Sequence, residues 1–301
     1  MEAKVEMKNQ GKNGGTMSFK TIYTGNMSSI IQINASFFLR LGNLPVRDQC
    51  NTGILISEDG IILVDFPEQH PSDEIISEVE SLFQKKVTHI FFTHAHGDHR
   101  NGLSGLRRSD ILLLASGEGA REIRKCYPDL SNPFRTFCSG DSVTVGGISF
   151  HVVIPKRLPA HSPWDMLIFC DTYDILFTGD FLNPPDTLYF HSSNYKNWAE
   201  ALAENWASFD GKLLIPGHGM PWTVQEARRS FSYISELGAL FEALQKKGIN
   251  GDSVAGKEDL LRLFPEERER ICSLERAASG QHLLRQLREI TRSAEENIRA
   301  E

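Results

Sequence analysis

Apolar and polar positions along the chain predict two β-rich halves that are followed by a helical region. Apolar runs of strand length, each bounded by turn residues or polar residues, are typical of β-strands. The expected strands are 30–41, 53–57, 60–65 and 88–93 in the first half, and 143–145, 148–154, 166–170, 175–178 and 212–215 in the second. Helices are expected from a cap at Ser72 to Phe83, and from a cap at Ser193 through Trp206. The pattern indicates an α+β fold.

The pattern changes to a helical period after Trp222. Thr223 and Glu226 have the spacing of a capping box, and a helix is expected from there to Gly248. Further amphipathic helices are predicted at 257–264, 265–278 and 281–300. We therefore expect a main domain at 19–222 and a helical C-terminal extension at 223–301. Residues 1–18 are polar and are predicted to form a disordered tail.

A polar cluster directly follows the apolar run at the end of the first half. Residues 93–99 read Thr-His-Ala-His-Gly-Asp-His, which places His94, His96, Asp98 and His99 within six positions. At a strand end that leads into a tight turn, His94 and His96 can converge on one cation. The next two polar residues, Asp98 and His99, can then face a second cation. Imidazole and carboxylate ligands favour zinc, with iron or manganese as alternatives. The segment predicts a metal site.

Three further candidate ligands follow or end apolar runs. His161 lies in Pro-Ala-His-Ser-Pro-Trp, Asp180 ends Ile-Leu-Phe-Thr-Gly-Asp, and His218 lies in Ile-Pro-Gly-His-Gly. Taken singly, His218 between glycines is typical of a turn, and Asp180 is typical of a cap or turn. Together with the cluster at 93–99, they predict ligands that collect along one edge of the sheets.

On these residues, from about 30 to 222, the chain resembles the metallo-beta-lactamase-fold superfamily. The resemblance implies a four-layer αββα sandwich with a binuclear metal centre. The implied ligands are His94, His96 and His161 for the first metal, Asp98, His99 and His218 for the second, and Asp180 for both. Asp65 matches a position that supports the metal loop without binding metal, and such partners orient the ligands.

The resemblance implies a catalytic domain at 19–222 that acts as a dinuclear zinc-dependent hydrolase of a small ester, thioester or lactone. A metal-bridging hydroxide would attack, with Asp98 orienting it. Because metallo-beta-lactamases proper lack the carboxylate at Asp180, the ligand set is more similar to thioesterases of the glyoxalase II kind and to lactone hydrolases. The lactone hydrolases often have Tyr where this chain has Asn183, and the basic glutathione-binding cluster of glyoxalase II is not recognisable in the tail. The substrate therefore stays open.

Two other enzyme classes of the same fold are alternatives. Persulfide dioxygenases have a similar motif and bind a single iron, which makes an iron-dependent oxidoreductase the second hypothesis. A nuclease is disfavoured because the formal net charge of −7 offers no general attraction for a phosphate backbone. β-Lactam hydrolysis is likewise disfavoured. We expect a small-molecule substrate and no nucleic-acid partner, with the helical extension either capping the sandwich or forming a homodimer.

The remaining composition agrees with a cytoplasmic enzyme. The chain of 301 residues has 40% hydrophobic residues, enough for a full core, and no apolar run approaches the roughly 18 residues of a membrane span. Its five cysteines lack paired spacing, which favours reduced thiols. His191 follows the Asp180 segment and is a further candidate for the pocket. Five aromatic residues are predicted in the core rather than in a pocket wall: Phe66, Trp164, Phe181, Tyr189 and Trp222.

Overall fold

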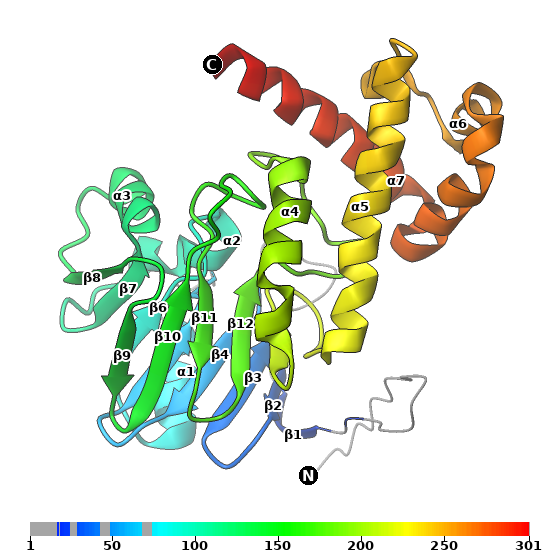
Figure 1. Ribbon diagram of the computed structural model, residues 1–301. Helices are drawn as coiled ribbons and strands as arrows, with labels where there is room; N and C mark the ends of the chain where they lie inside the picture. Colours follow the sequence, from blue (N-terminus) through cyan, green and yellow to red (C-terminus); the bar gives the residue numbers. More distant parts are fainter. Residues whose placement is uncertain (1–16, 18, 25–28, 43–48, 68–73, 301) are drawn as a thin grey trace.

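Four layers make up the protein, with two β-sheets face to face and helices on the outer side of each (Figure 1). The computed structural model describes residues 17, 19–24, 29–42, 49–67 and 74–300. The predicted tail, apart from Met17, and the predicted cap Ser72 lie outside the described residues. The α+β fold and the αββα order of layers are as predicted.

The first sheet has eight strands that follow each other in chain order. They are β1 (Lys20–Thr24), β2 (Ser29–Gln32), β3 (Phe37–Leu41), β4 (Thr52–Ile56), β5 (Ile61–Val64), β6 (Val87–Phe91), β7 (Leu112–Ser116) and β8 (Phe134–Phe137). Strands β1 to β5 pair antiparallel, whereas β5 to β8 pair parallel. Helices α1 (Glu74–Phe83) and α3 (Gly117–Cys126) pack on this sheet, and α2 (Gly97–Arg100) with η1 (Asn101–Gly105) follows β6.

The second sheet has five strands in the order β13-β12-β11-β10-β9. They are β9 (Ser142–Val145), β10 (Ile148–Val153), β11 (Leu167–Cys170), β12 (Ile175–Gly179) and β13 (Leu213–Pro216), of which β12 and β13 pair parallel. Helix α4 (Tyr195–Asn205), η2 (Trp206–Phe209) and helix α5 (Val224–Lys246) cover its outer face (Figure 1).

Three apolar clusters fill the spaces between the four layers. Successive side chains of strand β5 point to opposite faces of the sheet and so belong to two different clusters. Ile61 and Leu63 pack on the helix side. Ile62 and Val64 face the second sheet. Between the sheets, the ring of Phe91 lies with its centroid 4.9 Å from that of Phe150. The alternation therefore fixes which face of each strand is turned to each layer.

The predicted single strand 30–41 is wrong, because the chain forms the hairpin of β2 and β3 instead. The side-chain oxygen of Asn34 accepts hydrogen bonds from the backbone N–H groups of Ser36 and Phe37, at 2.9 and 2.8 Å. A short polar side chain that bonds its own backbone competes with the strand ladder and favours a turn. The apolar run is thereby divided into two antiparallel strands.

The extension after residue 222 is helical, as expected. It comprises α5, η3 (Gly251–Ser253), α6 (Lys257–Leu263), η4 (Pro265–Glu267) and α7 (Arg268–Ala300), and Thr223 and Glu226 form the capping box. In place of the predicted helices 265–278 and 281–300, the chain forms η4 and then one continuous helix, α7, because Gly280 inside a helix costs only about 1 kcal/mol. None of the described helices is both long and apolar enough to cross a membrane.

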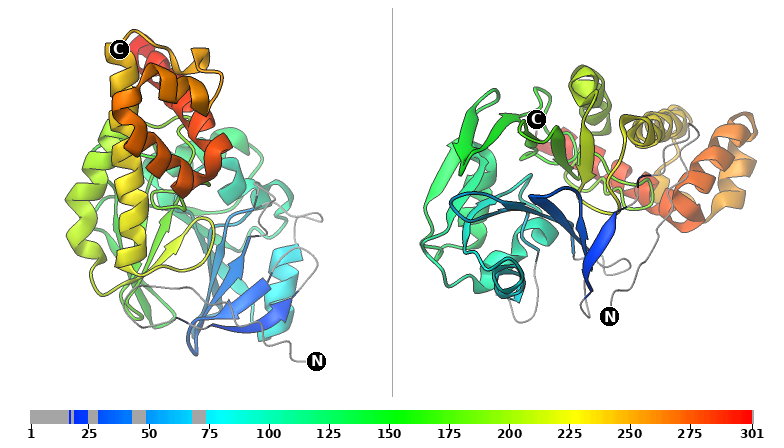
Figure 2. Two further views of the ribbon diagram at one scale, coloured as in Figure 1. Left: turned by 90° about the vertical axis from the view of Figure 1, so that its right-hand side faces the viewer. Right: turned by 90° about the horizontal axis from the view of Figure 1, so that it is seen from below.

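Helix α7 packs against both α5 and α6, and α6 with the first part of α7 lies nearest the viewer in the left view of Figure 2. One apolar cluster runs without a break from the second sheet through α5 to α7, and includes Leu176, Leu237 and Leu287. The chain changes at residue 222 from mixed strands and helices to helices alone, but the two parts share one hydrophobic core.

We expect Phe91→Ala to lower the free energy of unfolding by about 3–5 kcal/mol, because it opens a cavity between the sheets. Urea denaturation of the variant and the parent protein measures this loss. Leu82 of α1, which is 37% exposed, offers a matched control, and Leu82→Ala should change stability by less than about 1 kcal/mol. Equal losses in the two variants would contradict the central position of Phe91.

Candidate metal centre

Four strand ends meet at one edge of the two sheets. Strands β5 and β6 run parallel, as do β12 and β13, so the carboxyl ends within each pair lie side by side. Asp65 follows β5, His94 lies three residues after β6, Asp180 follows β12, and His218 lies two residues after β13. All the candidate ligands predicted from the sequence are gathered at this edge, in two groups.

The first cluster comprises His94, His96 and His161, whose potential ligand atoms lie within 4.8 Å of one another. Nδ1 of His96 is 2.9 Å from Nε2 of His161, and the two rings are nearly perpendicular. Nε2 of His94 is buried and has no hydrogen-bond partner among the described residues. Buried polar atoms are normally paired, so three ring nitrogens that face one another in this way fit a cation.

The second cluster comprises Asp98, His99, Asp180 and His218, again within 4.8 Å of one another. Nε2 of His218 is 3.1 Å from Oδ2 of Asp98, and Nε2 of His99 is 3.1 Å from Oδ1 of Asp180. Imidazole nitrogens and carboxylate oxygens in this ratio match the ligand preferences of zinc.

Asp180 lies between the two clusters. Its Oδ1 faces the second cluster, 3.1 Å from Nε2 of His99 and 3.6 Å from Nε2 of His218. Its Oδ2 faces the first cluster, 3.7 Å from Nε2 of His161. One carboxylate therefore presents one oxygen to each cluster, which is the arrangement that a bridging ligand requires.

Asp65 is buried beneath the second cluster and joins the ends of β5 and β6. Its carboxylate accepts hydrogen bonds from the backbone N–H and the hydroxyl of Thr93, both at 2.8 Å. Oδ2 also lies 2.9 Å from Nδ1 of His99. This contact turns Nε2 of His99 toward the cluster, as a carboxylate partner of a metal-binding histidine does.

Gly217 allows the strand β13 to approach the centre. A Cβ atom at this position would lie 2.0 Å from Oδ1 of Asp180 and 2.9 Å from Cε1 of His99. Gly179, at φ +50°, makes a similar approach, with a Cβ position 2.3 Å from the hydroxyl oxygen of Thr93. The glycines that precede His218 and Asp180 are thus required by close packing against the ligands.

Burial keeps the histidines of the first cluster neutral. It lowers the pKa of His161 to about 3, and it lowers the pKa values of His94 and His96 as well. A neutral imidazole has a free lone pair for a metal ion. This cluster can therefore bind a cation at neutral pH without first losing protons.

The second cluster is electrostatically different. Burial favours a lower pKa for His218, but the carboxylates of Asp180 and Asp98 outweigh burial and raise this pKa to about 9. Burial is likewise outweighed at His99, where the surrounding acidic side chains raise the pKa well above its ordinary value. A metal ion in this cluster must compete with the protons on both imidazoles.

The structure adds Cys50, which the sequence did not indicate, and shows a supporting contact of Asn183. The thiol of Cys50 lies within 4.8 Å of the potential ligand atoms of Asp65 and His99, and burial raises its pKa to about 12, so it stays neutral. It has no motif spacing that could have identified it. Asn183 is buried and accepts the N–H of His218 through its side-chain oxygen, at 3.1 Å.

Residues that were candidates for the pocket wall divide into two groups. Phe66 and Phe181 are buried in the core, as expected. Trp164 is half-buried, and its ring centroid lies 5.6 Å from that of His96, so it borders the first cluster. The pKa of His96 is lowered chiefly by burial, and His191 is exposed.

Comparison with known proteins agrees with this geometry. The sequence model of the metallo-beta-lactamase superfamily matches residues 45–218, which is more than half of the chain. The chain belongs to the metallo-beta-lactamase superfamily. A metallo-beta-lactamase type 2 of Bacillus sp. (strain 170) is 24% identical over 209 residues, which cover 65% of this chain and 77% of that protein.

Solved structures that match this chain have the same fold. A metallo-beta-lactamase from Pontibacter korlensis superimposes with a TM-score of 0.60 at 17% identity, over 69% of this chain and 99% of that chain. A double mutant of the sec-alkyl sulfatase PisA1 superimposes with a TM-score of 0.64 at 16% identity, over 88% of this chain and 50% of that chain. The larger coverage of this chain means that the likeness to the sulfatase extends into the helical extension.

We expect zinc binding to the second cluster to depend more steeply on pH than binding to the first. The pKa of His218 is raised to about 9, above the ordinary value of histidine. Protonated His218 therefore stabilises the metal-free fold fully at a pH below the ordinary pKa of histidine, and this stabilisation is lost as the pH rises through about 9. Zinc competes with the same proton, so affinity should rise over this range. Calorimetric titration with zinc, in buffers of different ionisation enthalpy, measures the protons released at each site. Equal proton release at the two sites would contradict this difference.

We expect Gly217→Ala to reduce the metal content of the purified protein, because the added methyl group displaces Asp180 or His99. Elemental mass spectrometry gives the number of metal ions per chain. Gly117→Ala is the matched control, since a Cβ atom there meets nothing within 4 Å. Full metal content in Gly217→Ala would show that this close approach is not needed for binding.

Proposed function

We propose that the protein is a dinuclear zinc-dependent hydrolase that cleaves a small ester, thioester or lactone. The observation that carries this proposal is the position of Asp180, which offers one carboxylate oxygen to each of two adjacent clusters of ligands. A shared carboxylate is suited to holding two metal ions at the short separation used by two-metal hydrolases.

The chain supplies a complete set of donors for such a pair. His94, His96 and His161 would hold the first metal, and Asp98, His99 and His218 the second, with Asp180 shared. When bound, a zinc pair supplies activated water and polarises the bond to be cleaved. Asp65 keeps His99 in the orientation and tautomer that leave Nε2 free for coordination.

Asp98 is the residue of the second cluster best placed to act on the reacting water. Its side chain is 22% exposed, whereas that of His99 is fully buried and that of Asp180 is 6% exposed. Asp98 therefore faces the open side of the centre, while His218 holds its Oδ2 at 3.1 Å. From this position it would orient the nucleophile and accept a proton from it.

The side chain of Asn183 bears on the choice of substrate. Its oxygen is occupied by the N–H of His218, and the residue is fully buried, so it supports the metal loop and presents no hydroxyl to a substrate. The lactone hydrolases that the chain resembles often have Tyr here. An ester or thioester is for this reason preferred to a lactone.

A sulfate ester is a second candidate substrate. The fold similarity to the sec-alkyl sulfatase includes part of the helical extension, whereas the similarity to the metallo-beta-lactamase from Pontibacter korlensis covers 69% of the chain. A secondary alkyl sulfate therefore belongs in the panel of test substrates, beside carboxylic esters, thioesters, lactones and a β-lactam.

We also propose a reducing compartment, the cytoplasm, as the place of action. All five cysteines are free thiols, and two of them, Cys126 and Cys138, are exposed. Exposed free thiols are typical of proteins kept in a reducing environment. The partner that we propose is a small molecule and not a nucleic acid, and a homodimer through the extension is the assembly to test by light scattering.

We expect Asp98→Ala to lower kcat by at least about a hundredfold on the substrate that the parent protein cleaves best, because orientation and general-base assistance are lost. The fold should be retained. Asp129 is an exposed residue in a turn outside both clusters. The control variant Asp129→Ala should therefore leave the rate unchanged. An unchanged rate in Asp98→Ala would rule out the proposed role.

The same preparations should be analysed for metal after expression in medium that contains both zinc and iron. About two zinc ions per chain are expected. Removal with a chelator should abolish hydrolysis, and added zinc should restore it. A single iron per chain, with no hydrolysis of the panel, would instead support the oxidoreductase hypothesis.

A further inference from the structure

A loop of residues 183–193 leads from Asp180 to helix α4 and borders both clusters. At its start, the side-chain oxygen of Asn183 accepts the N–H of His218. Just after its end, the N–H of Asn194 donates to the carbonyl of Ala160, the residue before His161. The loop therefore passes from the second cluster to the first along the edge of the centre.

Helix α7 holds the middle of this loop through one buried side chain. Gln286 is fully buried, and its Nε2 donates to the carbonyl oxygens of Pro185 and Leu188, at 2.7 and 3.1 Å. Its Oε1 accepts a hydrogen bond from the hydroxyl of Tyr233 in α5. Both hydrogens of the Gln286 amide are therefore used to hold the loop, and α5 fixes the amide in this orientation.

Further side chains of the extension hold the rest of the loop. On α7, Glu289 accepts the N–H of Phe190 at 3.1 Å, and the hydroxyl of Ser293 donates to the carbonyl of Ser193 at 2.7 Å. Glu289 and Ser293 lie four residues apart and so share one face of the helix. On α5, the hydroxyl of Ser230 donates to the carbonyl of Asn183 at 2.6 Å.

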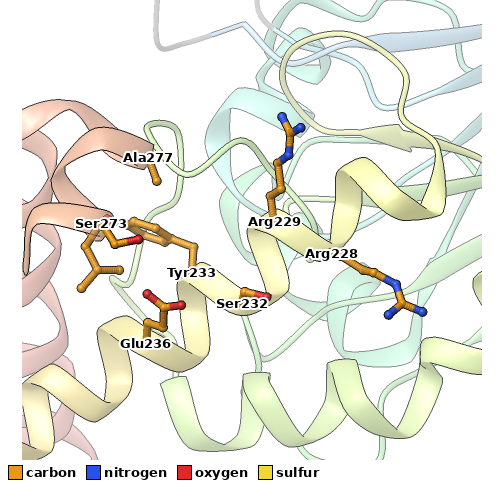
Figure 3. Close-up of a pocket in the computed structure, with 8 residues that line it drawn as sticks. Arg228, Arg229, Ser232, Tyr233, Glu236, Ser273 and Ala277 are labelled. Atoms are coloured by element: carbon orange, nitrogen blue, oxygen red, sulfur yellow. The ribbon is translucent and has the colours of Figure 1, made fainter. Parts of the chain in front are cut away.

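The close-up of the region between α5 and α7 shows Tyr233 extending from α5 toward Ser273 of α7 (Figure 3). Tyr233 is buried to 3% exposure, although it borders a surface pocket of about 320 Å³ between the two helices. Its ring thus closes the space between the helices, and its hydroxyl meets Gln286.

The loop presents partly exposed side chains near the metal centre. Tyr189 is half-buried beneath the guanidinium of Arg285, at 4.2 Å from the ring centroid. His191 is exposed. Both side chains belong to the loop whose ends are bonded to His218 and to the residue before His161.

We propose that Gln286 is a positioning residue, which fixes loop 183–193 as the substrate-facing wall of the metal centre. The part of this inference that concerns substrate rests on the proposed hydrolase function. Removal of the amide leaves the half-buried carbonyl of Pro185 without its donor, and leaves the carbonyl of Leu188 with only the guanidinium of Arg285, at 3.0 Å. The loss of these bonds is costly enough to release the loop. The clusters themselves keep all their ligands.

The test compares Gln286→Met with the parent protein, both loaded with zinc, by hydrogen–deuterium exchange of peptides that cover residues 184–193. Methionine retains the volume of glutamine and removes its hydrogen bonds. We expect exchange in the loop to be about tenfold faster, with unchanged zinc content, since roughly one hydrogen bond's net contribution is lost. On a cleaved substrate we expect a KM about tenfold higher and a kcat within a factor of about three.

Thr291→Val is the matched control on the same helix. The hydroxyl of Thr291 is buried and donates to the carbonyl of Leu287, so Thr291→Val removes a buried hydrogen bond within α7 without touching the loop. Equal changes in loop exchange and KM for both variants would show general destabilisation and overturn the positioning role.

Unchanged loop exchange in Gln286→Met would overturn the role directly. Faster exchange with an unchanged KM would show that the loop does not face substrate, which also overturns the proposal. If the parent protein cleaves none of the panel, the hydrolase proposal fails, while the exchange rates still decide whether Gln286 positions the loop.

Discussion

The buried carboxylate of Asp65 is the contact on which the metal centre depends. It binds the backbone and hydroxyl of Thr93 and the ring of His99, and so joins β5, β6 and the start of α2 at one point. Asp65 adopts φ +63°, a conformation that is uncommon for a residue with a side chain. Such a conformation persists only where surrounding contacts impose it, and the three hydrogen bonds do so.

The histidines of the two clusters differ in protonation because their neighbouring side chains differ. His161 is buried beside other imidazoles and is neutral, whereas His218 lies against Asp98 and Asp180 and holds a proton. Burying the histidines of either cluster costs free energy in a protein without a cation. Polar atoms such as Nε2 of His94, for example, lack partners among the described residues. A pair of bound metal ions would satisfy both clusters at once, and for this reason the donor set is best understood as a binding site.

Local patterns in the sequence predicted the ligands, and the family resemblance implied the support from Asp65, but nothing in the sequence indicated the hydrogen bonds of Gln286. The motif that contains His94 and His96 has its spacing set by one strand end and one turn, so it is readable from neighbouring residues alone. The hairpin at Asn34 was missed because it depends on two side-chain hydrogen bonds inside an apolar run. The contact of Gln286 with residues about 100 positions earlier left no local signal, since only the folded chain brings them together.

The loop after Asp180 explains why a helical extension belongs to this centre. Pro184 and Pro185 have no backbone N–H, so this stretch cannot pair as a strand or continue as a helix. Their carbonyl oxygens still need donors, and the carbonyl of Pro185 obtains one from Gln286 of α7. A chain that ended after the sandwich would leave this carbonyl without that donor beside the metal centre. The extension therefore completes the wall of the centre as well as the core beneath it.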